Sequence, residues 1–257
     1  MTLAVILAAG RGARSGSDGP KSLQMLAEKT WQRWQLDALA AAGVGQSLLV
    51  TGYSADTFAS LPNQRHVYHA NWATTGPISS LWSALNEIPD QPLLIAYADC
   101  LWHPDWIARL IACEADIALS VDLDWNALWS RRFADPLSDA ETLIMRGNGV
   151  HRWLHSIGAK PLNTHEIEGQ FMGLWRVSAQ GCSTLRNFLR HLIGDDLAQL
   201  DSTALFQRWL EFAPIACVVG AGAWLELDHR SDLDAYEHAM TTEDFSHDPR
   251  RPPRWPD

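Results

Sequence analysis

The feature that most constrains the fold of this chain is its opening segment, where an apolar run is followed at once by a glycine-rich turn. Residues 3–8 are all apolar, and a run of this length predicts a buried strand. Gly10 and Gly12 then allow the backbone to turn sharply and to expose N–H groups. Three cations lie on the same short loop: Arg11, Arg14 and Lys21. Fixed N–H donors with nearby cations are typical of a loop that binds polyphosphate.

Two common phosphate-binding loops do not fit this spacing. The dinucleotide fingerprint needs Gly or Ala three residues after Gly12, where the chain has Ser15, which disfavours a dinucleotide-dependent oxidoreductase. The P-loop needs Gly directly before its lysine, whereas Pro20 precedes Lys21. The remaining alternatives are another kind of nucleotide loop and an ordinary strand-to-helix turn with incidental basic residues.

Strand-like and helix-like segments alternate along the first half of the chain, which predicts an α/β fold with a mostly parallel, doubly wound sheet. The expected strands are 3–8, 47–52, 66–69, 93–98 and 116–121, and the expected helices are 31–42, 77–88 and 104–113. Ligands of such sheets bind at the carboxyl ends of the strands. We therefore expect the functional site where residues 7–8 and 97–99 end their strands.

The second half is less regular. Residues 122–170 are rich in charge and tryptophan, which indicates an insertion that covers the substrate side of the sheet. The segments expected after it are a strand pair within 164–177, helices at 178–193 and 202–211, a strand at 215–219, and a helix over 231–240 that begins after Ser231 as N-cap. We expect one domain over 1–242. The proline-rich tail 243–257 is either ordered on contact or disordered.

Composition narrows the classes of partner. A net charge of −10 and an isoelectric point near 5.4 argue against nucleic acid or an anionic membrane as partner. The four cysteines show no metal-type spacing, and the apolar start is too short to span a bilayer and lacks a basic flank, so we expect a cytoplasmic protein. Most of the thirteen tryptophans suit packing, although a tryptophan-rich surface would also suit a homodimer.

Two aspartates follow predicted strands. Asp99 comes directly after the run 93–98, and Asp228 ends the alternating segment 224–228. Two carboxylates at one sheet edge are able to hold a divalent cation, and Mg²⁺ prefers one or two carboxylates together with substrate phosphates. The alternative is that each aspartate has a purely structural role.

The motifs together resemble the phosphocholine cytidylyltransferase family of NTP transferases, over roughly residues 2–240. The matching segments are 7–12, the pair Pro20-Lys21, 34–39, 75–81, 135–141, 166–173, 224–228 and Asp232-Leu233. The opening motif is shared by the whole sugar-nucleotide-pyrophosphorylase-like superfamily, whereas 135–141 and 166–173 are more specific to this branch. The loop from Arg14 to Pro20 is short for the superfamily.

The resemblance implies a Rossmann-like fold with helices on both faces of a mixed sheet, and CMP transfer from CTP to a small phosphorylated or phosphonate acceptor with release of pyrophosphate. It implies Mg²⁺ ligation by Asp99 and Asp228 and catalytic roles for Lys21 and Arg11 on the phosphates. The implied nucleotide-binding residues are Leu7, Ala8, Ala9, Gly10, Arg11, Gly12, Lys21, Gly76, Ser79 and Ala98. Glu168 and Glu226 are implied to lie on the acceptor side.

The nucleophile of this reaction is an already ionised phosphate, so no general base is needed, and we expect Lys21→Ala and Asp228→Ala to lose most turnover while staying folded. A choline-like headgroup prefers aromatic faces, for which the candidates are Tyr97, Trp125, Trp129 and Trp224; these side chains equally suit the core. An amine such as 2-aminoethylphosphonate prefers carboxylates, for which the candidates are Asp122, Asp124 and Glu141. Two other functions remain open: a sugar-1-phosphate nucleotidyltransferase that uses UTP or another NTP, and a non-catalytic nucleotide-binding module.

Overall fold

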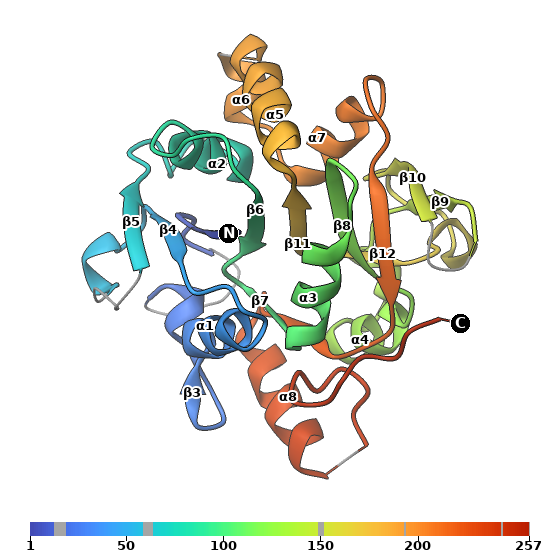
Figure 1. Cartoon of the computed structure of the whole chain (residues 1–257). Coiled ribbons are helices and arrows are strands. Elements are labelled where there is room, and N and C mark those ends of the chain that lie inside the picture. The colour runs from blue at the N-terminus through green and yellow to red at the C-terminus, as the bar shows by residue number, and fades with distance from the viewer. Residues whose placement is uncertain (13–18, 59–63, 149–151, 193, 243, 257) are drawn as a thin grey trace.

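The protein is built on one large mixed sheet, seen here in a computed structural model that describes residues 1–12, 19–58, 64–148, 152–192, 194–242 and 244–256 (Figure 1). Within these residues the sheet has nine strands in the order β5-β4-β1-β6-β11-β8-β12-β10-β9. Their bounds are β1 (Leu3–Ala8), β4 (Ser47–Thr51), β5 (Gln64–Tyr68), β6 (Leu93–Tyr97), β8 (Ile117–Asp122), β9 (Leu143–Arg146), β10 (Arg152–Ile157), β11 (Gln170–Val177) and β12 (Ala216–Gly220). Strands β10 and β11 run opposite to the others, so the sheet is mostly parallel, as predicted.

Helices cover both faces of the sheet, which confirms the doubly wound arrangement (Figure 1). One face carries α2 (Pro77–Leu85), α5 (Ala179–His191), α6 (Asp195–Ala198) and α7 (Ser202–Trp209). The other carries α1 (Trp31–Ala41), α3 (Pro104–Ala112), α4 (Trp125–Arg132) and α8 (Arg230–Thr242). Strand β1 contributes side chains to the hydrophobic cores on both faces of the sheet. Ala4 and Ile6 belong to one cluster, and Leu3 and Val5 belong to the other. This alternation is what a fully buried parallel strand requires.

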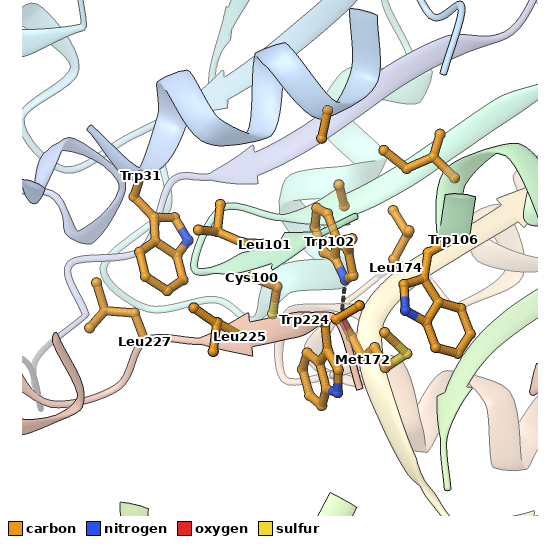
Figure 2. Close-up of a cluster of buried hydrophobic side chains, with 14 of the residues drawn as sticks. Trp31, Cys100, Leu101, Trp102, Trp106, Met172, Leu174, Trp224, Leu225 and Leu227 are labelled. Atoms are coloured by element: carbon orange, nitrogen blue, oxygen red, sulfur yellow. Dashed lines mark hydrogen bonds between the residues drawn. The ribbon is translucent and has the colours of Figure 1, made fainter. Parts of the chain in front are cut away.

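Two small ribbons complete the described part of the chain. One joins β2 (Met25–Leu26) to β3 (Lys29–Thr30), and the other pairs β7 (Cys100–Trp102) antiparallel with β13 (Trp224–Glu226). Figure 2 shows the second ribbon inside a cluster of buried side chains, where the indole of Trp102 donates a 2.8 Å hydrogen bond to the carbonyl of Met172. Short 3-10 turns lie at Lys21–Leu23, Ala55–Thr57, Pro136–Ser138 and Thr164–Glu166. The β7–β13 ribbon is therefore a buried platform that is bonded to β11 through Trp102.

Three segments differ from expectation. The predicted strand pair within 164–177 is wrong, because this segment forms a 3-10 turn followed by the single strand β11. Ser231 is not an N-cap, because α8 already begins at Arg230; the carboxylate of Asp232 instead accepts backbone hydrogen bonds from Asp228 and His229, at 2.8 Å each. Residues 122–170 contribute α4 and then the β9–β10 hairpin, which extends the sheet beyond β12. Arg14 and Ser15 of the opening loop lie outside the described residues.

Within the proline-rich tail, the described residues 244–256 pack against the domain. Ala221 and Arg254 exchange backbone hydrogen bonds of 2.8 and 3.0 Å, and the side chain of His247 is buried, 2.8 Å from Asp122. The ring of Trp255 meets that of Trp106 edge-on, with centroids 4.7 Å apart. Of the two alternatives for the tail, the structure has the ordered one. None of the described helices is both long and apolar enough to cross a membrane.

Candidate active site

The glycine turn after β1 opens onto a cavity of 420 Å³ at the carboxyl ends of the strands. A Cβ atom on Gly10 would meet nothing within 4 Å, so the backbone here is accessible from the cavity. Gly12 has φ +63°, and a Cβ there would lie 2.7 Å from the side chain of Lys21. Gly12 is thus required both for the left-handed turn and for the path of the Lys21 side chain across it.

The β7–β13 ribbon brings the two predicted carboxylates together. Cys100 at the start of β7 pairs with Glu226 at the end of β13, so the residues just outside the ribbon, Asp99 and Asp228, come from the same end of it. The backbone N–H of Leu227 donates to the carbonyl of Asp99 at 2.8 Å, which fixes the two segments next to each other. Two positions far apart in sequence therefore deliver their carboxylates to one wall of the cavity.

Lys21 lies between these carboxylates. Its Nζ is 2.8 Å from Oδ1 of Asp228 and 3.4 Å from Oδ2 of Asp99. Burial by itself would lower the pKa of Lys21, but the charges of Asp99 and Asp228 outweigh burial and raise the pKa. The lysine therefore stays protonated in a site that is largely shielded from solvent.

Arg132, at the end of α4, binds Asp228 and the neighbouring Glu226. Its side chain is fully buried, and its guanidinium donates to Oε2 of Glu226 at 2.7 Å and to Oδ2 of Asp228 at 2.8 Å; Asp232 lies 3.7 Å from its Nε. No local sequence signal marks this residue, since an arginine in a charged, tryptophan-rich segment is typical of a solvated side chain. The arginine holds Asp228 from one side while Lys21 holds it from the other.

The site carries an excess of negative charge. Three carboxylates line the cavity, those of Asp99, Glu226 and Asp228, against the two cations Lys21 and Arg132. Burial, only partly offset by Arg132, together with the nearby Asp228, raises the pKa of Glu226 to about 7. A raised carboxyl pKa means that further positive charge at this position is favourable.

The donor set fits Mg²⁺. Its groups are hard carboxylate oxygens whose mutual distance is set by a shared lysine, and Mg²⁺ is usually held by one or two carboxylates plus substrate phosphates. Across the residues that the structure describes, no group of three or more His, Cys, Asp or Glu side chains forms a cage able to hold a metal by protein ligands alone. A cation at Asp99 and Asp228 would therefore need oxygens from a ligand.

Most of the predicted nucleotide-binding residues converge on this cavity. It is lined by the predicted Leu7, Ala9, Gly10, Gly12, Lys21, Gly76, Tyr97, Asp99, Glu226 and Asp228, and also by Trp72, Thr75, Pro77 and Ser80, which sequence reasoning missed. Ala8 and Ala98 line an adjoining hollow of 100 Å³ that shares Lys21 and Asp99 with the cavity. The sequence alone indicates the glycine motif and the segment 75–81. The fold is needed to show which residues near them face the cavity.

Two predicted residues lie differently. Arg11 is exposed, with its guanidinium 5.6 Å from the ring centroid of Tyr53, and it does not line the cavity. Ser79 does not line the cavity, whereas the adjacent Ser80 does. The helical geometry of α2 explains the difference, because consecutive residues on a helix face different directions.

The expected acceptor residues need correction. Trp125, Trp129 and Trp224 are buried core side chains, 4%, 4% and 0% exposed, and none lines the cavity; Trp224 lies in the core cluster of Figure 2. Asp122 is fully buried and accepts hydrogen bonds from the indole of Trp224 at 2.8 Å and from the N–H of Gly222 at 2.9 Å. These residues read as acceptor candidates because tryptophan next to acid also suits an aromatic cage, but their contacts are structural.

The remaining acidic candidates also lie outside the cavity lining. Glu168 is exposed and accepts a 2.6 Å hydrogen bond from the N–H of Met145. Asp124 accepts from Arg254 of the tail at 2.7 Å. Burial raises the pKa of Glu141, whose backbone carbonyl accepts from Gln170. Of the acceptor candidates, only Tyr97 and Glu226 line the cavity.

Comparisons with known proteins show NTP transferases among the proteins that this chain is similar to. The model of the MobA-like NTP transferase domain matches residues 4–160. The chain is 32% identical over 250 residues to the CTP:phosphoglutamine cytidylyltransferase of Campylobacter jejuni, covering 90% of this chain and 97% of that protein. The resemblance to cytidylyltransferases is thereby confirmed.

Solved structures show the same fold. The inositol-1-phosphate CTP transferase from T. maritima superposes with a TM-score of 0.71 at 15% identity, covering 94% of this chain and 97% of the other. The CTP:phosphocholine cytidylyltransferase LicC from Streptococcus pneumoniae superposes with a TM-score of 0.71 at 16% identity, covering 93% and 99%. With the matched domain model spanning more than half of its length, the chain belongs to the MobA-like NTP transferase family.

Proposed function

We propose that this protein transfers CMP from CTP to a small phosphorylated or phosphonate acceptor and releases pyrophosphate. One observation carries the proposal: Nζ of Lys21 lies within 2.8 and 3.4 Å of two carboxylates, next to an accessible glycine turn in a 420 Å³ cavity. Such a site combines N–H donors, a fixed cation and oxygen ligands for a metal. Those are the groups that bind a metal-bound triphosphate.

The chain's own residues would have separate tasks. The backbone of Gly10 and Gly12 would bind phosphate oxygens, because no side chain covers Gly10. Lys21, already protonated and buried, would neutralise the charge that grows on the leaving pyrophosphate. Asp99 and Asp228 would hold Mg²⁺, which when bound supplies further neutralisation of phosphate charge. That Arg11 binds the phosphates stays a prediction from the sequence.

The reaction balances without a general base. An ionised oxygen of the acceptor phosphate forms a bond to the α-phosphorus of CTP, and the bond from that phosphorus to the bridging oxygen breaks. The bridging oxygen leaves with pyrophosphate and takes the electron pair. Because no proton is removed from the nucleophile, positioning and charge neutralisation are the contributions required of the protein.

The acceptor is proposed from the relatives and the cavity together. Phosphoglutamine is the first candidate, because the relative that is named for it aligns over 97% of its length. The aromatic side chains at the cavity are Trp72 and Tyr97, so the broad tryptophan cage expected for choline is not supported. Phosphocholine and 2-aminoethylphosphonate remain test acceptors of the same chemical class.

Pyrophosphate release with a panel of donors and acceptors tests the proposal. CTP, UTP, ATP and GTP are each combined with phosphoglutamine, phosphocholine, 2-aminoethylphosphonate and glucose 1-phosphate, with Mg²⁺ or with EDTA. We expect release with CTP and one of the first three acceptors, and none with EDTA. A preference for UTP with glucose 1-phosphate would instead identify a sugar-1-phosphate nucleotidyltransferase. Binding of Mg-CTP without release for any pair would indicate a non-catalytic nucleotide-binding module.

A further inference from the structure

Asp99 lies in a short turn from Tyr97, at the end of β6, to Cys100, at the start of β7. The turn joins a strand of the large sheet to a strand of the β7–β13 ribbon. The N–H of Ala98 donates to the carbonyl of Leu7 at 3.2 Å, which fixes the turn against β1. Two further backbone groups of this turn, the carbonyls of Tyr97 and Cys100, point to the side of α1 and need a donor there.

Gln35 of α1 supplies that donor to both carbonyls. Its side-chain Nε2 lies 2.7 Å from the carbonyl oxygen of Tyr97 and 2.6 Å from that of Cys100. An amide nitrogen has two N–H groups, so one hydrogen is available for each oxygen. Gln35 is 1% exposed, so a lost hydrogen bond here would leave carbonyl oxygens buried without a ready replacement from solvent.

A bulge of β11 also packs against this turn. Gly173 has φ +65°, and a Cβ atom there would lie 2.6 Å from Sγ of Cys100. The pairing register of β11 shifts at this point, between Phe171 and Trp175. Figure 2 shows Cys100 within the buried cluster next to this strand. The turn is therefore confined by β11 through the side chain of Cys100 and held by Gln35 through two backbone carbonyls.

We propose that Gln35 is a positioning residue, which fixes the turn Tyr97–Cys100 so that the Asp99 carboxylate faces Lys21 and Asp228. Gln35 does not line the cavity, so it acts through the backbone of the turn and not by contact with a ligand. This inference rests on the proposed function, because it assigns Gln35 to the site that would hold the divalent cation and the nucleotide. Residues that orient a metal ligand typically affect metal affinity or activity by about 10–100-fold when mutated.

The test compares Gln35→Met with Gln32→Met. Methionine keeps the length of the side chain and removes both donors. Gln32 lies on the same helix and is 6% exposed, but its amide is 3.5 Å from Gln64 and does not contact the turn. Three quantities are measured: the melting temperature, Mn²⁺ binding by electron paramagnetic resonance with and without CTP, and the Mg²⁺ dependence of kcat and KM.

We expect Gln35→Met to weaken Mn²⁺ binding by about 10-fold or more, to raise the Mg²⁺ concentration needed for half-maximal rate, and to lower kcat by about 10–100-fold. Gln32→Met should match the wild type in all three quantities within about twofold. If Gln35→Met does not fold, Gln35→Asn is used, which keeps the amide but is too short to reach both carbonyls. It should shift Mn²⁺ binding in the same direction.

Two results would overturn the role of Gln35. One is a folded Gln35 variant whose Mn²⁺ affinity and Mg²⁺ dependence equal those of the wild type or of Gln32→Met. The other is a wild-type protein that binds no Mn²⁺ under either condition. Failure of the proposed function looks different: the wild type binds Mn²⁺, Gln35→Met weakens that binding, and neither protein releases pyrophosphate with any substrate pair.

Discussion

Replacing Arg132, which holds two carboxylates of the cavity lining, by methionine should cost the protein much of its stability. The guanidinium is fully buried and donates hydrogen bonds of 2.7 and 2.8 Å to Glu226 and Asp228, with Asp232 at 3.7 Å. A hydrogen bond between charged groups contributes about 1.5–3 kcal/mol, so the two bonds together give about 3–6 kcal/mol. Removing one partner of a buried ion pair costs about 3–5 kcal/mol, because the other charge is left uncompensated. We therefore expect the free energy of unfolding to fall by about 4 kcal/mol.

Urea unfolding followed by circular dichroism measures this loss. Arg131→Met is the matched control, since the guanidinium of Arg131 lies over the ring of Phe245 at 5.0 Å and contributes about 0.5–2 kcal/mol in that way. Neutralising Glu226 and Asp228 as amides in the Arg132→Met background should restore part of the stability, because the uncompensated charge is then gone. The loss should also shrink as the pH is lowered and the carboxylates become protonated. A folded Arg132→Met protein within about 1 kcal/mol of the wild type would show that Arg132 does not compensate these buried carboxylates.

Three further outcomes follow from the packing around the site. Burial opposes ionisation of Asp122, but the hydrogen bond and the charge of His247 outweigh burial and lower the pKa of Asp122. The ionised carboxylate therefore stabilises the folded protein above about pH 4, and this stability is lost as the pH falls through the pKa of Asp122 in the folded state. Asp122→Asn should flatten that loss in urea titrations at acidic pH, and an unchanged pH profile would contradict the assignment. Trp224→Phe removes the 2.8 Å bond to Asp122 and should destabilise the protein by about 1–3 kcal/mol while leaving the acceptor KM within about twofold, whereas a tenfold rise in KM would place the indole at the cavity. Gly173→Ala combines φ +65° with a Cβ 2.6 Å from Sγ of Cys100, so its melting temperature should fall by several degrees, and an unchanged value would show that the bulge is not confined.

The parts of the site that the sequence predicted depend on local signals. A buried strand before Gly10 and Gly12, and an aspartate at the end of another strand, each place a group at the carboxyl edge of a parallel sheet. The same reasoning predicts that Asp99 and Asp228 lie at one edge of the sheet. It does not predict the antiparallel ribbon that makes them adjacent, because three-residue strands have too weak a sequence pattern.

The residues that sequence reasoning missed act over long separations. Arg132 is 94 residues from Glu226 and 96 from Asp228, and Gln35 is 62 residues from Tyr97. Nothing in the local pattern of α1 or α4 distinguishes a buried polar side chain that contacts the site from one on a solvated helix face. Only the packing of both helices against the β7–β13 platform and the adjoining turn reveals these contacts.

For two tryptophans and the tail, the local sequence pattern indicates exposure where the structure shows burial or order. Trp129 and Trp224 each lie two residues before a charged residue, Arg131 and Glu226, yet both are buried, with ring centroids 5.9 Å apart. The four prolines after position 242 favoured an irregular extension. The tail is irregular but ordered, because Asp122 and Asp124 inside the domain bind His247 and Arg254 of the tail.

The most direct test of the account is the rate of pyrophosphate release by Lys21→Ala. Its Nζ is the cation that joins Asp99 and Asp228, so its loss should lower kcat by about 10²–10³-fold with the protein still folded. Lys29→Ala is the control, because Lys29 is a half-buried lysine that pairs with Asp37 and does not line the cavity. We predict that large, selective loss. A folded Lys21→Ala protein that turns over CTP at the wild-type rate would contradict it.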